Sequence, residues 1–242
     1  MTTGRFDVRN PSQLFELGRR RPGRKAAVKR GKSEKDAALF KGISLRSMKQ
    51  MNFESLLEKS VMIHGHLCPG QVLGVKMTIL GMKLVGVTRQ EEERPRNLIV
   101  YVEMDRCATD AVQSVSGCSL GHRTMKFLDY GKMAATFLNI ETGEAVRIIA
   151  REDTREKAKE LFPEMKDRYE AQMRTYMMMS DEELFDVMPV RVTVPPEDMP
   201  GRPLRRIQCA CCGEHVQDLR EVYRDGVALC RACANGTYYE RI

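Results

Sequence analysis

Four cysteines near the C-terminus constrain the fold of this chain more than any other feature. Cys209 and Cys212 form one C-x-x-C pair, and Cys230 and Cys233 form a second. A two-residue spacer lets both thiolates of a pair reach one tetrahedral zinc ion, and the intervening span fits a short β-hairpin. Residues 205–242 are therefore predicted to form a zinc ribbon with four cysteine ligands. Its folding should depend on the metal, because so short a segment cannot bury a core.

The function of such a ribbon is open, since zinc ribbons bind nucleic acid, bind protein or serve as purely structural units. Arg220, Arg224 and Arg231 lie among several acidic residues, so a nucleic-acid surface is an alternative that the charge pattern does not favour. Cys211 lies between the first pair and is either a spare thiol or an alternative ligand.

A second metal-type motif is the run His64–Gly70, H-G-H-L-C-P-G, which holds two of the four histidines. In an extended segment, alternation would place His64, His66 and Cys68 on one side. Two imidazoles and a thiol suit a borderline divalent metal such as zinc. The alternative is a buried turn with satisfied histidines and a small apolar cysteine. A proline and a glycine end the run, and an apolar helical pattern begins at Val72.

Composition sets the class of protein. The chain has 242 residues, enough for a medium domain and a small one, and it has no tryptophan. No apolar run reaches the ~18 to 20 residues that a membrane span needs, and the N-terminus has no apolar signal region. Eight cysteines in an unexported chain indicate metal-binding or catalytic thiols rather than disulfides. We therefore expect a cytoplasmic protein.

The net charge of +7 is concentrated in one segment. Residues 1–50 hold fourteen Lys and Arg against four Asp and Glu, a balance of +10, so the rest of the chain balances to 7 − 10 = −3. Residues 1–46 are predicted to be a flexible basic arm. Such an arm could contact nucleic acid, acidic lipid or an acidic partner, and a solvated tail is the simpler interpretation.

The remaining chain predicts an α+β fold, with mixed helices and strands in a core domain at 47–190 followed by a linker at 191–204 and the small ribbon. In the second predicted helix, Gly74 and Gly81 would permit close backbone packing. The predicted helices are 47–60, 72–85, 107–115 and a charged helical stretch at 151–188 broken at a proline. The predicted strands are 97–104, 124–128, 133–139, 145–150 and 191–194.

Further candidates for chemistry lie in the core domain. Cys107 follows the clearest strand, at a corner where it could converge with the motif at 64–70. Asp105 and Asp110 flank Cys107, and either could orient a ligand histidine or accept a proton. The alternative for Asp110 is a first-turn helix charge. Cys118 is either an exposed reactive thiol or a small buried cysteine. Lys132 is either a cation at the site or an exposed turn lysine. The candidates for catalysis are thus Cys68, Cys107, Asp110, Cys118 and Lys132.

Four motifs in this order resemble a known family. H-G-H-L-C-P-G at 64–70, D-R-C-A-T-D-A at 105–111, G-C-S-L-G at 117–121 and D-Y-G-K-M at 129–133 are similar to the FmdE family, which is named after a subunit of formylmethanofuran dehydrogenase. The C-terminal cysteine pairs resemble the DksA/TraR-type zinc ribbon that often follows this domain. The resemblance covers about residues 50–238.

The resemblance implies an α+β core that dimerises, a structural zinc ion in the ribbon, and a second divalent metal, expected to be zinc. The implied ligands of this second metal are His64, His66, Cys68 and Cys107. The family name derives from a complex that oxidises formylmethanofuran on molybdenum or tungsten. After the ribbon is counted, too few clustered cysteines are left for an iron–sulfur cluster, and no dinucleotide-type phosphate loop is present, so we do not expect the redox catalyst itself.

Three functions follow as hypotheses. The first is a metal-binding homodimer accessory to a molybdenum or tungsten enzyme of one-carbon or formate-type redox metabolism. The second is a hydrolase or transferase that uses an open-site metal and a thiol. The third is a nucleic-acid-binding regulator acting through the arm and the ribbon, which is not favoured. The sequence does not decide whether the protein is an enzyme.

Overall fold

A five-stranded mixed sheet organises the core. The computed structural model describes residues 48–88, 94–240 and 242, so the basic arm lies outside the described residues. The strand order is β2-β1-β3-β4-β5, with β1 and β2 parallel and all other neighbours antiparallel. The strands are β1 (Leu98–Val102), β2 (Met125–Phe127), β3 (Ala134–Asn139), β4 (Ala145–Ala150) and β5 (Phe185–Pro189).

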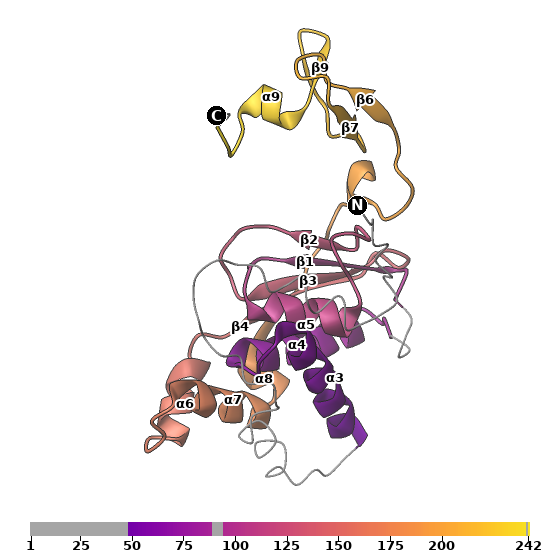
Figure 1. Ribbon diagram of the computed structural model, residues 1–242. Coiled ribbons are helices and arrows are strands. Elements are labelled where there is room, and N and C mark those ends of the chain that lie inside the picture. The colour runs from indigo at the N-terminus through magenta and orange to yellow at the C-terminus, as the bar shows by residue number, and fades with distance from the viewer. Residues whose placement is uncertain (1–47, 89–93, 241) are drawn as a thin grey trace, which may run out of the picture. The chain divides into compact units, whose positions relative to one another are not determined.

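Three helices, α3, α4 and α5, lie on one side of this sheet (Figure 1). They are α3 (Met48–His64), α4 (Pro69–Leu84) and α5 (Cys107–Ser116). Helix α5 connects the parallel strands β1 and β2, as a parallel pair requires. Helix α4 is buried along most of its length, since a largely apolar helix has no face suited to water. The α+β prediction is thus confirmed.

Glycines set the distance between α4 and its neighbours. A Cβ atom added at Gly74 would lie 2.6 Å from the Ala111 Cβ and 2.7 Å from the Ala108 carbonyl oxygen on α5. One added at Gly81 would collide with the ring of Phe137 on β3. Backbone and ring therefore occupy the space of the missing side chains. The predicted close packing at both glycines is confirmed.

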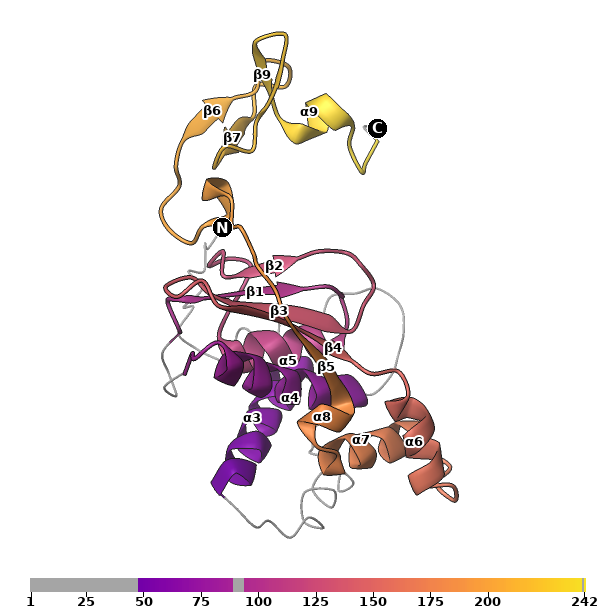
Figure 2. The ribbon, with the colours of Figure 1, turned by 180° about the vertical axis from the view of Figure 1, so that it is seen from behind.

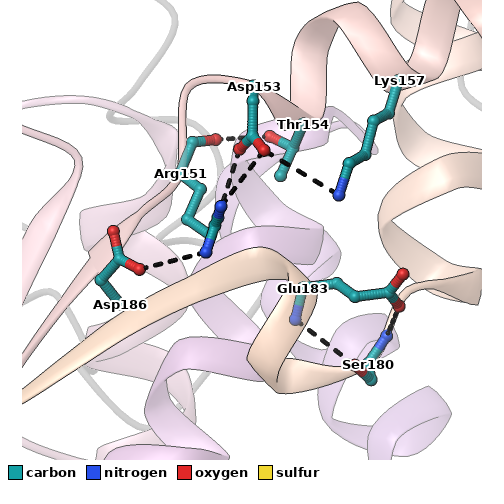
Figure 3. A network of polar contacts seen from close by, with 7 residues as sticks. All are labelled: Arg151, Asp153, Thr154, Lys157, Ser180, Glu183 and Asp186. Carbon is teal, nitrogen blue, oxygen red and sulfur yellow. Dashed lines mark hydrogen bonds and ion pairs between the residues drawn. The ribbon is translucent and has the colours of Figure 1, made fainter.

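The prediction of a helical stretch at 151–188 was wrong at its C-terminal end, where a strand forms. Helices α6 (Thr154–Leu161), α7 (Arg168–Met178) and α8 (Asp181–Leu184) end before the edge strand β5, in which Phe185 pairs with Ala150 of β4. Residues 151–184 thus form an excursion from the sheet between β4 and β5. Polar contacts stabilise both ends of this excursion, as Figure 3 shows. Arg151 pairs with Asp153 and Asp186, and a capping box begins α8.

The strand predicted at 191–194 does not form either. Val190 still pairs with β4, because its amide donates to the Ala145 carbonyl oxygen at 3.0 Å. Beyond Val190 the segment forms no strand (Figure 2), and Val190, Val192 and Val194 contact a buried cluster that includes Ile99 and Leu138. A period of two is the signature of an extended chain, and it cannot tell a paired strand from a strap that crosses a sheet face.

The C-terminal unit consists of two hairpins and a short helix. Its elements are β6 (Arg206–Gln208), β7 (His215–Gln217), β8 (Val222–Arg224), β9 (Val227–Leu229) and α9 (Arg231–Asn235). A single 3-10 turn, η1 (Pro196–Asp198), precedes them. Among all the helices described, none has the length and apolar character that crossing a bilayer requires.

The packing at Gly74 predicts the effect of one added methyl group. Gly74→Ala should lower the free energy of unfolding by about 1–3 kcal/mol, because overpacking of α4 against the α5 backbone outweighs the gain in helix propensity. The matched control is Gly121→Ala, where an added Cβ meets nothing within 4 Å. Urea unfolding of both variants measures the difference, and equal stabilities would contradict the packing argument.

Candidate metal centres

The C-terminal cysteines converge as the spacing predicts. The thiols of Cys209, Cys212, Cys230 and Cys233 all lie within 4.8 Å of one another. The first pair occupies the turn between β6 and β7, where the Gly213 amide donates to the Cys209 carbonyl at 2.9 Å. Cys230 caps α9, and the Cys233 amide donates to its sulfur at 3.3 Å. Four thiols are the full ligand set of a closed structural zinc site.

Backbone amides prepare this group to hold a cation. The amides of Cys212 and Cys230 donate hydrogen bonds to the Cys209 sulfur, and these bonds lower the pKa of the Cys209 thiol to about 6. The pKa of the Cys233 thiol is raised, mainly by its hydrogen bond with the Cys230 side chain. Cys211 is exposed and is not one of the four converging thiols.

A second group forms in the core from His64, Cys68 and Cys107, whose ligand atoms also lie within 4.8 Å of one another. His64 is the last residue of α3, Cys68 is the N-cap of α4, and Cys107 is the first residue of α5. Three helix ends therefore meet at one point.

The expected extended segment at 64–68 is absent, and this is a correction. Helix α3 continues through His64 and breaks at Gly65, whose φ of +95° few other residues adopt. The chain turns there, so the ligands converge through a corner between two helices rather than along one edge of a strand.

His64 is oriented for metal binding by a carboxylate. Its Nδ1 lies 2.7 Å from an Asp110 carboxylate oxygen, and since a carboxylate only accepts, Nδ1 carries the proton. Its Nε2 is buried and has no hydrogen-bond partner among the described residues. A buried nitrogen without a partner is costly, and a cation bound between Nε2 and the two thiols would satisfy it.

The Cys68 thiol of the core group has a pKa shifted in the opposite direction from that of Cys209 in the ribbon. Burial raises the pKa of the Cys68 thiol to about 11, with the neighbouring Cys107 thiol adding to the rise. Two thiolates and a neutral imidazole balance the charge of a divalent cation. If His64, Cys68 and Cys107 are the only protein ligands, one coordination position stays open, which is typical of catalytic or exchanging zinc rather than of a closed structural site.

The structure places the other candidates outside this group. The His66 ring lies beside that of His64, with centroids 4.6 Å apart, so its role as a ligand stays a prediction. Cys118 is fully buried, with its sulfur 3.7 Å from the Leu98 carbonyl oxygen. Lys132 is exposed beside the Tyr130 ring, and no described contact joins it to the core ligands.

Sequence reasoning missed two buried polar residues beside the ligands, Ser60 and Gln71. Both are inaccessible to solvent, and Gln71 donates to the Cys107 carbonyl oxygen. The available signal was a glutamine in the first turn of a largely apolar helix, where a buried amide needs a partner.

Comparisons with known proteins match the part of the chain that holds the core group. A family model described as "FmdE, Molybdenum formylmethanofuran dehydrogenase operon" matches residues 63–186, which include His64, Cys68 and Cys107. A protein of Archaeoglobus fulgidus named "Probable S-adenosyl-L-methionine-binding protein" is 32% identical over 209 residues, 78% of this chain. The chain spans only 55% of that relative's length.

A solved structure shares the fold. The crystal structure of a tungsten formylmethanofuran dehydrogenase FmdE-like protein from Syntrophus aciditrophicus matches with a TM-score of 0.54 and 21% identity. The match covers 82% of this chain and all of that one.

The two ligand groups predict two metal ions per chain after reconstitution with zinc. Cys68→Ser should lose one ion and Cys230→Ser the other, because each substitution removes a ligand from one group only. Elemental analysis after dialysis measures the stoichiometry. Cys211→Ser, which removes a thiol outside both groups, should keep two ions, and a loss there would contradict the assignment.

The contact between Asp110 and His64 predicts that Asp110→Asn weakens metal binding at the core site by about 10- to 100-fold. The amide cannot hold the Nδ1 proton as a carboxylate does. Asp105→Asn removes the same charge two residues from Cys107 and should have little effect. Competition with a chromophoric chelator measures both affinities, and equal losses would mean that only the local charge matters.

Proposed function

The chain belongs to the FmdE family, and we propose that it is a metal-binding accessory protein of molybdenum- or tungsten-dependent one-carbon or formate-type redox metabolism. The observation that carries the proposal is the three-ligand core group. A centre with two thiols, one oriented imidazole and one open position can accept a fourth ligand from a partner or pass its ion on.

The chemistry of the core group supports handling of a metal rather than permanent storage. The ribbon offers four thiols, whereas the core group offers two thiols and one imidazole. A closed shell of four thiolates is typical of structural zinc sites, and a shell with fewer protein ligands leaves a position through which the ion can exchange. We therefore expect the ribbon ion to be tight and the core ion to exchange.

The proposal includes the homodimer and the molybdenum or tungsten enzyme partner predicted from the sequence, with zinc as the expected core metal. The family description names the molybdenum formylmethanofuran dehydrogenase operon, and this supports a role beside such an enzyme. Light scattering of the full chain tests the dimer.

Deletion of the gene tests the metabolic role. In the organism that carries it, the activity of the molybdenum- or tungsten-dependent formate-type oxidoreductase should fall several-fold in cell extracts. The wild-type gene and Cys211→Ser should restore the activity, whereas Cys107→Ser should not, because it removes a core ligand. Unchanged activity in the deletion strain would contradict the proposal.

A second function, a hydrolase or transferase with an open-site metal, is favoured by the same three-ligand count, which matches catalytic zinc sites. It requires turnover by the purified metal-loaded chain, with loss of activity in Cys68→Ala and no unfolding. An accessory protein has no turnover of its own. The nucleic-acid hypothesis depends on the arm outside the described residues, and in the ribbon Arg220 is already paired with Asp198.

A further inference from the structure

Two fully buried polar side chains lie between the helices that carry the core ligands. Ser60 on α3 and Gln71 on α4 are both inaccessible to solvent, although the faces around them are apolar. Buried amides and hydroxyls destabilise a fold unless they are hydrogen-bonded. The hydrogen-bond partners of Ser60 and Gln71 therefore indicate the role of these two side chains.

The two side chains form a relay that ends on a ligand residue. The Ser60 hydroxyl donates to Gln71 Oε1, and Gln71 Nε2 donates to the Cys107 carbonyl oxygen at 2.5 Å. The direction is fixed at one end, because a carbonyl only accepts, and the amide oxygen must then accept from the hydroxyl. Both polar ends of the Gln71 side chain are thus satisfied.

Each member of the relay lies close in sequence to one metal ligand. Ser60 precedes His64 by four residues, one turn along α3, and Gln71 follows Cys68 by three residues, in the first turn of α4. The third member is Cys107 itself. The relay therefore ties together the three segments whose ends meet at the core group.

We propose that the relay of Ser60, Gln71 and the Cys107 carbonyl positions the core ligands for metal binding, with Gln71 as the central positioning residue. The inference rests on the proposed function, since it requires that the core group binds a metal. The missing side chain of Gly70 supports it: an added Cβ there would lie 2.9 Å from the Cys107 Cβ. The two helix starts are in direct contact, so the Cys107 backbone depends on how α4 holds it.

A matched control separates positioning from general stability. Thr78 is also fully buried on α4, seven residues after Gln71 on the same face of the helix, but its hydroxyl donates only to the Gly74 carbonyl of its own helix. Gln71→Met and Thr78→Val both keep approximate size and remove a buried polar group. Only the first breaks a contact with a ligand-bearing segment.

The test is a Co²⁺ titration of the full chain after its ribbon has been loaded with zinc. Visible absorption reports the geometry and thiolate coordination of Co²⁺ at the core site. Gln71→Met should weaken Co²⁺ binding at least about 10-fold and alter the spectrum, whereas Thr78→Val should bind within about threefold of wild type with an unchanged spectrum. Ser60→Ala should give a smaller loss, and Ser60→Thr, which keeps the hydroxyl, should restore binding.

The outcomes distinguish the two levels of inference. If wild type binds Co²⁺ and Gln71→Met binds it with the same affinity and spectrum, the relay does not position the ligands. If Gln71→Met does not fold, Ser60→Ala decides: wild-type affinity and spectrum would overturn the positioning role. If wild type takes up no Co²⁺ beyond the ribbon, the proposed function itself fails.

Discussion

The close contact between α4 and α5 is the constraint on which the core depends. No side chain separates the helices at Gly74, where the Ala108 backbone fills the space of a Cβ. Because Cys68 caps the start of α4 and Cys107 begins α5, the same approach that buries the apolar faces of the helices brings these two thiols together. The contact that packs the core therefore also assembles the site, and a change that separates the helices should weaken both.

Much of this arrangement could be predicted because its determinants are local. The cysteine spacing of the ribbon, the strand rich in β-branched residues at 98–102 and the two close-packing glycines on α4 each follow from a few neighbouring residues. The corner at Gly65 could not be read this way. Alternation at 64–68 fits a strand as well as it fits three residues at a helix end and the next N-cap, and only tertiary packing decides.

The other misses have the same origin. Residues 185–189 follow a helical stretch and are short, and their pairing with β4 depends on contacts distant in sequence. Val190, Val192 and Val194 alternate as in a strand but pack across the sheet face. The Ser60–Gln71 relay connects residues eleven apart, and Gln71 reaches a carbonyl 36 residues later. No motif encodes such a contact.

The excursion through α6, α7 and α8 has a consequence for the architecture. It leaves the sheet after Ala150 and returns at Phe185, two residues that pair directly across β4 and β5. Since closing a loop costs entropy only with the logarithm of its length, the sheet could tolerate a much shorter connection at this point. However, Lys76 of α4 donates to the Tyr176 and Met179 carbonyls at the end of α7. Deleting these helices would leave a half-buried ammonium group without its hydrogen-bond acceptors. The pairing of the sheet would allow the segment to be shortened, but the ammonium group of Lys76 needs its carbonyl acceptors. A redesign that shortens the segment must therefore also replace Lys76.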